Sequence, residues 1–121
     1  MISDLIMTIG MSGIMKTSKR KNILILGANG MLGSMVYFYF VNFTNHKITG
    51  TYNKKKIYKK FRKFDAEIFI SNENKYKSLF NKVDYIINCI GLIKPDTINN
   101  TRKAIEINSL FPHILNNFIK N

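Results

Sequence analysis

Three glycines at three-residue spacing follow a short apolar run, and this combination constrains the fold more than any other feature of the chain. The run is Asn22–Leu26, and the glycines are Gly27, Gly30 and Gly33. A continuous apolar run of this length is expected of a parallel strand that is buried on both faces of its sheet. Because glycine permits a tight turn directly before a helix, we predict a strand, a glycine turn and a helix from Gly30 to about Phe43.

This turn has the properties of a phosphate-binding site. Gly27 allows a tight exit from the strand, Gly30 lets the backbone approach a pyrophosphate, and Gly33 lets the helix pack closely on the sheet. Free N–H groups and the helix dipole favour an anion at a helix N-terminus. A P-loop is excluded because no Gly-Lys-Ser/Thr follows, and a purely structural turn remains the alternative. The residues predicted to hold the dinucleotide here are Gly27, Asn29, Gly30, Met31, Leu32 and Gly33.

Beyond the turn, apolar runs alternate with segments of helical periodicity. Strands are expected at 47–52, 64–70 and 84–90, and helices at 73–82 and 101–119, with Ser71 or Asn72 as the N-cap of the first. Such alternation is typical of doubly wound sheets. We therefore predict an α/β fold, namely a partial NAD(P)-binding Rossmann fold with a parallel sheet of about four strands and flanking helices, truncated before the fifth strand.

Length and composition bound the organisation of the chain. Its 121 residues suffice for one domain. We expect residues 1–20 to be a leader, either disordered or a start placed too far upstream, and residues 21–121 to be the N-terminal part of a dinucleotide-binding domain. The single cysteine, Cys89, excludes an internal disulfide and suits a reducing compartment, so we predict a cytoplasmic protein. No apolar run reaches the ~20 residues of a membrane span, and we predict no membrane partner.

The net charge of +12 is concentrated in two clusters. A strongly basic chain attracts phosphates, whether of nucleic acids, anionic lipids or nucleotides. Solvated surface lysines are the alternative interpretation for most of these residues. Since no zinc-ligand spacing, ribonucleoprotein motif or helix-turn-helix accompanies them, we predict no specific nucleic-acid partner. The larger cluster comprises Lys54, Lys55, Lys56, Lys59, Lys60, Arg62 and Lys63, and the smaller one comprises Lys16, Lys19, Arg20 and Lys21.

Two further stretches join the glycine turn in a specific combination. They are INCIGLIKP at 87–95 and INSLFPHIL at 107–115. With the G-x-x-G-x-x-G spacing of 27–33, they resemble the extended short-chain dehydrogenases/reductases related to dTDP-4-dehydrorhamnose reductase, a sugar-nucleotide-binding family. The resemblance extends from about residue 21 to the end of the chain. It implies a nicotinamide cofactor and, for a full-length member, hydride transfer from NADPH to a 4-keto sugar nucleotide.

The resemblance also implies roles for particular residues. Cys89, Ile90 and Gly91 match the segment that lines the nicotinamide-ribose side of the pocket. Asp65 is the nearest match to an aspartate that contacts adenine, and an ordinary loop carboxylate is the alternative. Asn108 matches an asparagine that kinks its helix and helps to hold the active site together.

Pro112 predicts an irregularity in the helix that carries Asn108. Proline has no N–H and leaves the carbonyl four residues earlier, that of Asn108, without its helical partner. We predict a free Asn108 carbonyl, with a kink that serves only packing as the alternative. For Cys89 we expect a small buried side chain rather than a reactive thiol, because nothing nearby in the sequence lowers its pKa.

The choice of cofactor follows from the end of the second predicted strand. An acidic residue there binds the ribose hydroxyls of NAD, whereas a basic residue accommodates the 2′-phosphate of NADP. The segment reads Thr51-Tyr52-Asn53-Lys54-Lys55, and no carboxylate follows before Asp65. We therefore favour NADP over NAD, with Lys54 or Lys55 as the partner of the 2′-phosphate.

The residues that carry out reduction in this family are absent from the chain. Short-chain reductases use a Tyr-x-x-x-Lys pair, in which the tyrosine donates a proton and the lysine lowers its pKa. The only tyrosine with a lysine four residues later is Tyr52, with Lys56, and this pair falls on the adenosine side. His46, expected in an exposed turn, and His113, expected in helix packing or capping, are not predicted to transfer protons. Apart from a supporting role for Asn108, we predict no catalytic residue.

Two functions fit these observations. The first is the N-terminal NAD(P)-binding portion of a sugar-nucleotide reductase, inactive by itself and binding a sugar nucleotide only when the C-terminal part is supplied. The alternative is a non-catalytic nucleotide-binding module with a sensing or scaffolding role. A parallel sheet that ends after its fourth strand leaves that strand's outer edge unpaired, and we predict self-association through this edge.

Overall fold

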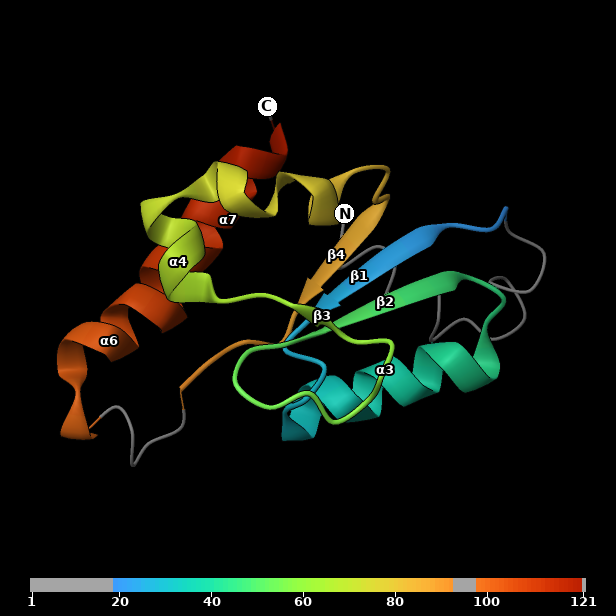
Figure 1. Cartoon of the computed structure of the whole chain (residues 1–121), viewed down its shortest axis with the longest axis horizontal. Helices are drawn as coiled ribbons and strands as arrows, with labels where there is room; N and C mark the ends of the chain where they lie inside the picture. Colours follow the sequence, from blue (N-terminus) through green and yellow to red (C-terminus); the bar gives the residue numbers. More distant parts are fainter. Residues whose placement is uncertain (1–18, 93–97, 121) are drawn as a thin grey trace.

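Four parallel strands form the sheet, in the order β3-β2-β1-β4 (Figure 1). The computed structural model describes residues 19–92 and 98–120, so nearly all of the leader expected at 1–20 lies outside the described residues. β1 pairs with β2 on one side and with β4 on the other. The strands are β1 (Asn22–Leu26), β2 (Lys47–Tyr52), β3 (Arg62–Lys63) and β4 (Tyr85–Asn88). The predicted α/β fold with about four parallel strands is confirmed.

Helices cover both faces of the sheet. One face is covered by α3, and the opposite face is covered by the remaining helices (Figure 1). This arrangement follows the alternation of strands and helices along the chain. The helices are α3 (Met31–Phe43), α4 (Ala66–Ser71), the 3₁₀ helix η1 (Glu73–Phe80), α6 (Thr101–Ile105), the π-helical segment η2 (Glu106–Leu110) and α7 (Phe111–Lys120).

β1 contributes to a hydrophobic core on each face, because successive side chains of a strand point to opposite faces. Ile23 and Ile25 pack with Phe40 of α3. Leu24 and Leu26 pack with Phe111 of α7 on the other side. These four side chains are at most 1% exposed. The burial on both faces that the apolar run predicts is therefore confirmed.

The strand predicted at 64–70 is wrong, because most of this segment forms the helix α4. Asp65 begins the helix: its Oδ1 accepts the backbone N–H groups two and three residues later, at 2.9 and 3.4 Å. Ala66 and Phe69 are both buried, at the three-residue spacing of one helix face. A short apolar run is compatible with either strand or helix periodicity, so the capping carboxylate of Asp65 decides between the two structures.

The helix predicted at 73–82 forms as the shorter 3₁₀ helix η1. It is kinked at Tyr76, where φ is −107° and ψ is 17°. Tyr76 and Leu79 are buried. Asn72 is the N-cap residue but makes no side-chain capping hydrogen bond, and Ser71 is instead the last residue of α4.

The long helix predicted at 101–119 is present but has an irregular centre, made up of α6, η2 and α7. The Phe111 N–H donates to the Glu106 carbonyl, five residues earlier instead of four. This π segment lies directly before Pro112, where a regular α-helical hydrogen bond cannot form. The free Asn108 carbonyl stays a prediction. The buried residues of this helix are Ala104, Ile107, Phe111 and Leu115.

Candidate functional site

The glycine turn lies where the sheet reverses its order. β1 has β2 on one side and β4 on the other, although the chain reaches β4 only after β2 and β3. In open α/β sheets, ligands bind at the carboxyl ends of the strands at such a switch point. Gly27 directly follows β1, and Cys89 directly follows β4. Because the Cys89 N–H donates to the Leu26 carbonyl at 2.9 Å, the two segments predicted to bind a dinucleotide lie side by side.

Two of the three glycines are required by the packing of the turn. Gly27 has φ +78°, and a Cβ there would lie 3.0 Å from Cγ1 of Ile90. A Cβ on Gly33 would lie 1.9 Å from the Gly27 carbonyl oxygen, so α3 packs on the turn at this point. By contrast, a Cβ on Gly30 would meet nothing within the described chain closer than 3.5 Å. Gly30 therefore leaves space above the turn.

The N-terminus of α3 carries backbone N–H groups without helical partners. The Gly30 N–H donates to the Gly27 carbonyl at 3.1 Å, and the Ser34 N–H donates to the Gly30 carbonyl at 2.8 Å. Helix geometry leaves the intervening N–H groups of residues 31–33 without an acceptor. No side chain caps this end, and the first turn holds no acidic residue. This end of the helix is therefore suited to bind an anion.

The end of β2 packs against the glycine turn. Thr51 is 1% exposed, and its Oγ1 accepts the Gly27 N–H at 3.0 Å. Beside it, a Cβ on Gly50 would lie 2.8 Å from both the Ala28 Cβ and a ring carbon of Phe61. Thr51 and Gly50 were not among the residues predicted for the site. The sequence signal for their contact with the turn is Gly50, because a glycine inside a strand often marks the close approach of another segment.

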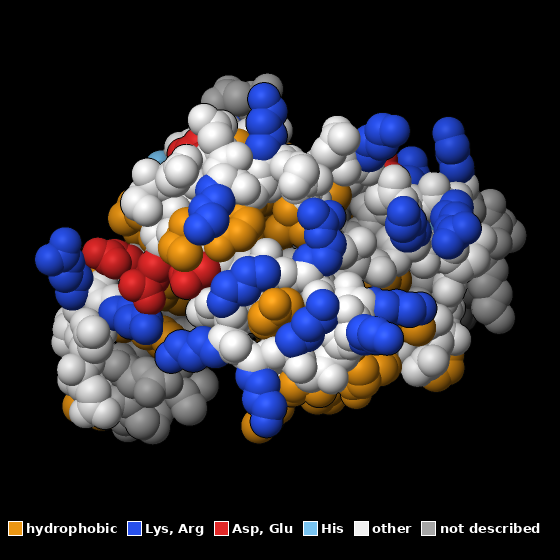
Figure 2. All heavy atoms as spheres, viewed as in Figure 1, with side chains coloured by type: hydrophobic (Ala, Val, Ile, Leu, Met, Phe, Trp, Pro, Cys, Tyr) orange, Lys and Arg blue, Asp and Glu red, His pale blue; other side chains and the backbone are white. Residues whose placement is uncertain are grey.

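Asn29 joins the glycine turn to the basic loop that follows β2. Its Nδ2 donates to the carbonyl of Lys55. Its Oδ1 is buried and finds no donor among the described residues. Lys54 and Lys55 are exposed on this loop, and Figure 2 shows Lys and Arg side chains over much of this face of the molecule. Asn29 thus holds the two lysines predicted to bind the 2′-phosphate close to the turn.

A small hollow of about 160 Å³ is lined by residues of the turn, the end of β2 and the start of α4. Lys54, Asp65 and Glu67 all line it. The Asp65 carboxylate caps α4, and the Asp65 N–H donates to the Tyr76 hydroxyl at 3.2 Å. Asp65 is therefore more than an ordinary loop carboxylate, and its contact with adenine stays a prediction. The hollow is smaller than a typical small-molecule pocket of about 300 Å³ or more, so it suits part of a dinucleotide.

Asn108 fastens the segment that follows β4. Its Oδ1 accepts the Leu92 N–H at 2.8 Å, and its Nδ2 donates to the Leu92 carbonyl at 3.3 Å. A Cβ on the neighbouring Gly91 would lie 3.4 Å from the same Oδ1. The structure therefore brings Asn108 to the segment predicted to line the nicotinamide ribose. The last three residues of the INCIGLIKP stretch, 93–95, lie outside the described residues.

Cys89 is partly buried, and desolvation raises the pKa of its thiol. A raised pKa keeps the thiol protonated and weakly nucleophilic at neutral pH. This agrees with the unreactive side chain expected from the sequence. The Ile90 N–H, next along the chain, donates to Oδ1 of Asn88 at 3.0 Å, which orders the same segment.

The exposure of the two histidines differs from that expected from the sequence. His46 is buried, with 6% of its surface exposed, and its Nδ1 accepts the Lys21 N–H at 2.9 Å. Its predicted exposure is wrong because this hydrogen bond ties the turn before β2 to the residue before β1. Burial, and secondarily the charges of Lys21 and Arg20, lower the pKa of His46. His113 is exposed, with its Nε2 3.4 Å from Nδ2 of Asn117, so its expected packing role is also wrong.

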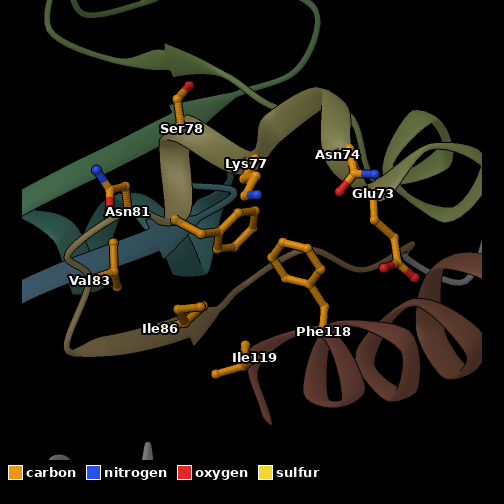
Figure 3. A pocket seen from close by; sticks show the side chains of 10 residues that line it. Glu73, Asn74, Lys77, Ser78, Asn81, Val83, Ile86, Phe118 and Ile119 are labelled. Atoms are coloured by element: carbon orange, nitrogen blue, oxygen red, sulfur yellow. The ribbon is translucent and has the colours of Figure 1, made fainter. Parts of the chain in front are cut away.

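A larger hollow of about 940 Å³ lies between η1, the start of β4 and the end of α7 (Figure 3). Phe80, Ile86 and Phe118 give it largely apolar walls. Size alone favours it as a ligand pocket. However, no residue predicted to bind the cofactor lines it. We therefore assign the candidate site to the glycine turn.

No group of His, Cys, Asp and Glu side chains that suits a metal ion occurs within residues 19–92 and 98–120. Over the same ranges, no helix has both the length and the apolar character needed to cross a membrane.

Solved structures with a similar fold include two proteins of bacterial origin. L-threonine dehydrogenase from Clostridium difficile aligns with 78% of this chain and 31% of its own, with a TM-score of 0.62 and 20% identity. The PbgP3 protein from Burkholderia pseudomallei aligns with 80% of this chain and 31% of its own, with the same TM-score and identity. No family model and no curated protein matches the sequence. These likenesses show a Rossmann-like fold, and the chain spans about a third of the length of each structure.

Proposed function

We propose that this chain binds a nicotinamide dinucleotide as the N-terminal, cofactor-binding portion of a cytoplasmic sugar-nucleotide reductase. The observation that carries this proposal is the set of free N–H groups of residues 31–33, at the switch point of the sheet and above a turn with no side chain in the way. A pyrophosphate is the anion that such a turn recognises in Rossmann folds.

The residues around the turn fit the rest of the cofactor. Asn29 offers a buried Oδ1 acceptor without a protein donor, a position that a ligand hydroxyl satisfies. Lys54 and Lys55 supply positive charge for a 2′-phosphate, which favours NADP over NAD. In this proposal Cys89 to Gly91 line the nicotinamide ribose, and Asn108 holds them through its hydrogen bond to Leu92. When bound, the reduced nicotinamide supplies the hydride.

The finer assignment rests on sequence motifs. One solved structure with a similar fold is described as a dehydrogenase, which supports a dinucleotide cofactor here. The resemblance to reductases of the dTDP-4-dehydrorhamnose type comes from the glycine turn together with the segments at 87–95 and 107–115. A sugar nucleotide is accordingly the substrate class that we propose for the complete enzyme.

One observation favours the alternative, a nucleotide-binding module without catalysis. The chain's only Tyr-x-x-x-Lys pair, Tyr52 and Lys56, lies at the end of β2. There the Lys56 Nζ lies 5.9 Å from the centre of the Tyr52 ring, a cation–π geometry. With this pair engaged at the adenosine side, we expect the 121-residue chain to bind a dinucleotide without reductase turnover.

Calorimetric titration of the full chain with NADPH and NADH tests the proposal. We expect both to bind and NADPH to bind more tightly. The paired change Lys54→Ala and Lys55→Ala is expected to remove the preference for NADPH, whereas the charge-matched control Lys59→Ala and Lys60→Ala should retain it. Absence of binding by either nucleotide at millimolar concentration would falsify the cofactor assignment. Measurable reduction of a keto sugar nucleotide by the chain alone would overturn the expected lack of turnover.

A further inference from the structure

Helix α3 presents an apolar face to solvent. Its outward side chains are exposed by 42 to 87%, whereas Gly33 and Phe40 of the same helix are buried. The helix contains no charged residue. At 1.5 Å per residue the exposed stripe runs for about 18 Å, and contiguous apolar surface of this kind marks an interaction site. The stripe consists of Met31, Leu32, Met35, Tyr39 and Phe43.

The basic loop lies alongside this stripe. Tyr58 of the loop contacts Phe38 of α3, with their ring centres 5.1 Å apart. Ile57 and Tyr58 are themselves exposed, by 58 and 44%, between exposed lysines on either side. Figure 2 shows hydrophobic side chains along the lower border of the molecule, directly beneath a group of Lys and Arg side chains. We call the combined surface the α3 face: the stripe, Ile57, Tyr58, and the lysines Lys54, Lys55, Lys56, Lys59 and Lys60.

The α3 face belongs to a segment without any negative charge. None of the seven acidic residues of the chain lies between residues 19 and 64. The same segment carries most of the Lys and Arg residues that make the net charge +12. An apolar stripe flanked by lysines and by no carboxylate matches the surface of proteins that lie in a membrane interface.

We propose that the α3 face binds a lipid surface rich in anionic headgroups. Met35 and Phe43 enter the boundary between headgroups and acyl chains, while Lys56, Lys59 and Lys60 contact the lipid phosphates. Tyr39 lies on the stripe, and tyrosine is enriched at such interfaces. The sequence-based prediction of no membrane partner rests on the absence of a spanning segment, and the vesicle experiment below decides between that prediction and this proposal.

Other occupants fit the α3 face less well. Two copies of this chain meeting through it would bring their lysine-rich loops together, and like charges across an interface oppose association. A nucleic acid would contact the lysines through its phosphates but would leave the methionine and phenylalanine side chains exposed to water. An anionic lipid surface is the partner that covers both parts.

Vesicle co-sedimentation of the full chain tests the proposal. We expect the chain to sediment with vesicles of phosphatidylcholine and phosphatidylserine in equal parts, and not with phosphatidylcholine alone. Each surface lysine contributes about fivefold to such binding, so Lys56→Glu, Lys59→Glu and Lys60→Glu together should weaken it by about 100-fold or more. Met35→Ser with Phe43→Ser should weaken it while leaving the net charge unchanged.

A charge-matched control separates a local site from a general effect of charge. Lys75→Glu, Lys77→Glu and Lys120→Glu change exposed lysines of η1 and α7, on the opposite face of the sheet. This variant should bind vesicles much more tightly than the loop variant. Equal losses in the two variants, or no loss on changing Met35 and Phe43, would overturn the proposal. So would failure to bind phosphatidylserine vesicles, or equal binding to duplex DNA that the Met35 and Phe43 changes leave unaffected.

Fluorescence gives a second readout that does not depend on affinity. The chain has no tryptophan, so Phe43→Trp introduces a single probe on the stripe, and Asn116→Trp introduces one on the exposed side of α7. With anionic vesicles, we expect the emission of the first variant to shift to shorter wavelength and to be quenched by brominated lipid. The second variant should show neither change. A probe at position 43 that stays in water contradicts insertion of α3.

Discussion

At the scale of single residues, the three glycines of the turn perform different tasks. Gly27 and Gly33 are packed closely against other atoms of the protein, so a side-chain carbon at either position would collide with them. Gly30 faces open space and has φ −77° and ψ 175°, which any residue adopts. The first two glycines are therefore required by the fold, and the role of Gly30 in ligand binding stays a prediction. This division can be tested by the same substitution at two positions.

Gly33→Ala is expected to destabilise the fold by about 3 kcal/mol or more, because backbone atoms of Gly27 already occupy the position of the new methyl group. Gly30→Ala should change the free energy of unfolding by less than about 1 kcal/mol. It should nevertheless weaken NADPH binding by about tenfold or more, since the methyl group occupies the space left for the pyrophosphate. Urea unfolding followed by circular dichroism measures the first effect, and calorimetry measures the second. Unchanged NADPH affinity in Gly30→Ala contradicts the placement of the pyrophosphate.

His46 makes folding sensitive to acid. Its pKa in the folded protein lies below the ordinary value of 6.5, so below that pH the unfolded state binds more protons than the folded state. Stability contributed by neutral His46 is therefore complete above about pH 7 and is lost as pH falls through 6.5 toward the folded-state pKa. His46→Asn keeps an acceptor for the Lys21 N–H and does not titrate.

Urea unfolding of both proteins across this pH range tests the role of His46. We expect the difference in unfolding free energy between wild type and His46→Asn to be constant above about pH 7, and the wild type to lose more stability below it. Carboxylates titrate equally in both proteins and cancel in the difference. A difference that does not vary with pH is inconsistent with a buried neutral His46.

At the scale of secondary-structure elements, the feature most specific to this site is the pair of hydrogen bonds between Asn108 of η2 and Leu92, which follows β4. Asn108 is exposed, so Asn108→Ala should lower the unfolding free energy by only about 1 kcal/mol. The local effect should be larger, because the Leu92 N–H loses its acceptor and should exchange with solvent much faster. NADPH affinity should fall as the nicotinamide-ribose segment loosens.

Amide hydrogen exchange followed by NMR measures this loosening, with calorimetry for the cofactor. Asn108→Asp is the matched control: its carboxylate still accepts the Leu92 N–H but no longer donates to the Leu92 carbonyl. It should retain much of the protection at Leu92. Equal protection of Leu92 in the alanine variant and the wild type would refute the positioning role of Asn108.

The elements show where sequence reasoning succeeds. The apolar run of β1 and the glycine turn predict the buried strand and the helix α3, since local chemistry and packing agree there. The run at 64–70 contains apolar residues at both helical and strand spacings, and the outcome depends on one capping bond from Asp65. Thr51 was missed because its hydrogen bond to Gly27 joins residues 24 apart in sequence. Contacts of this kind follow from the tertiary fold and not from a local pattern.

At the scale of the whole molecule, two features act on association in opposite directions. β4 pairs with β1 alone among the described strands, which leaves its outer edge open to another chain. The apolar hollow lined by Phe80, Ile86 and Phe118 lies next to this edge (Figure 3) and offers hydrophobic surface to the same partner. The net charge of +12 opposes the approach of a second copy.

We therefore expect self-association through β4 to strengthen as salt is added. Screening shortens the range of charge repulsion from about 10 Å at 0.1 M salt to about 3 Å at 1 M, while strand pairing and hydrophobic contact persist. Sedimentation velocity at increasing salt measures the change. Val83→Lys with Ile119→Lys places charges in the hollow and should keep the chain monomeric.

Two further comparisons identify the surface involved. Asn45→Lys with Asn116→Lys adds the same charge at exposed positions and should retain salt-promoted association, so that loss in the hollow variant alone assigns the contact to the β4 edge. Vesicle binding through the α3 face depends on attraction between opposite charges and should weaken over the same salt range. Opposite responses to salt thus separate the two surfaces within one protein. A monodisperse monomer at every salt concentration contradicts the β4 contact. The α3 face is tested separately, by vesicle binding.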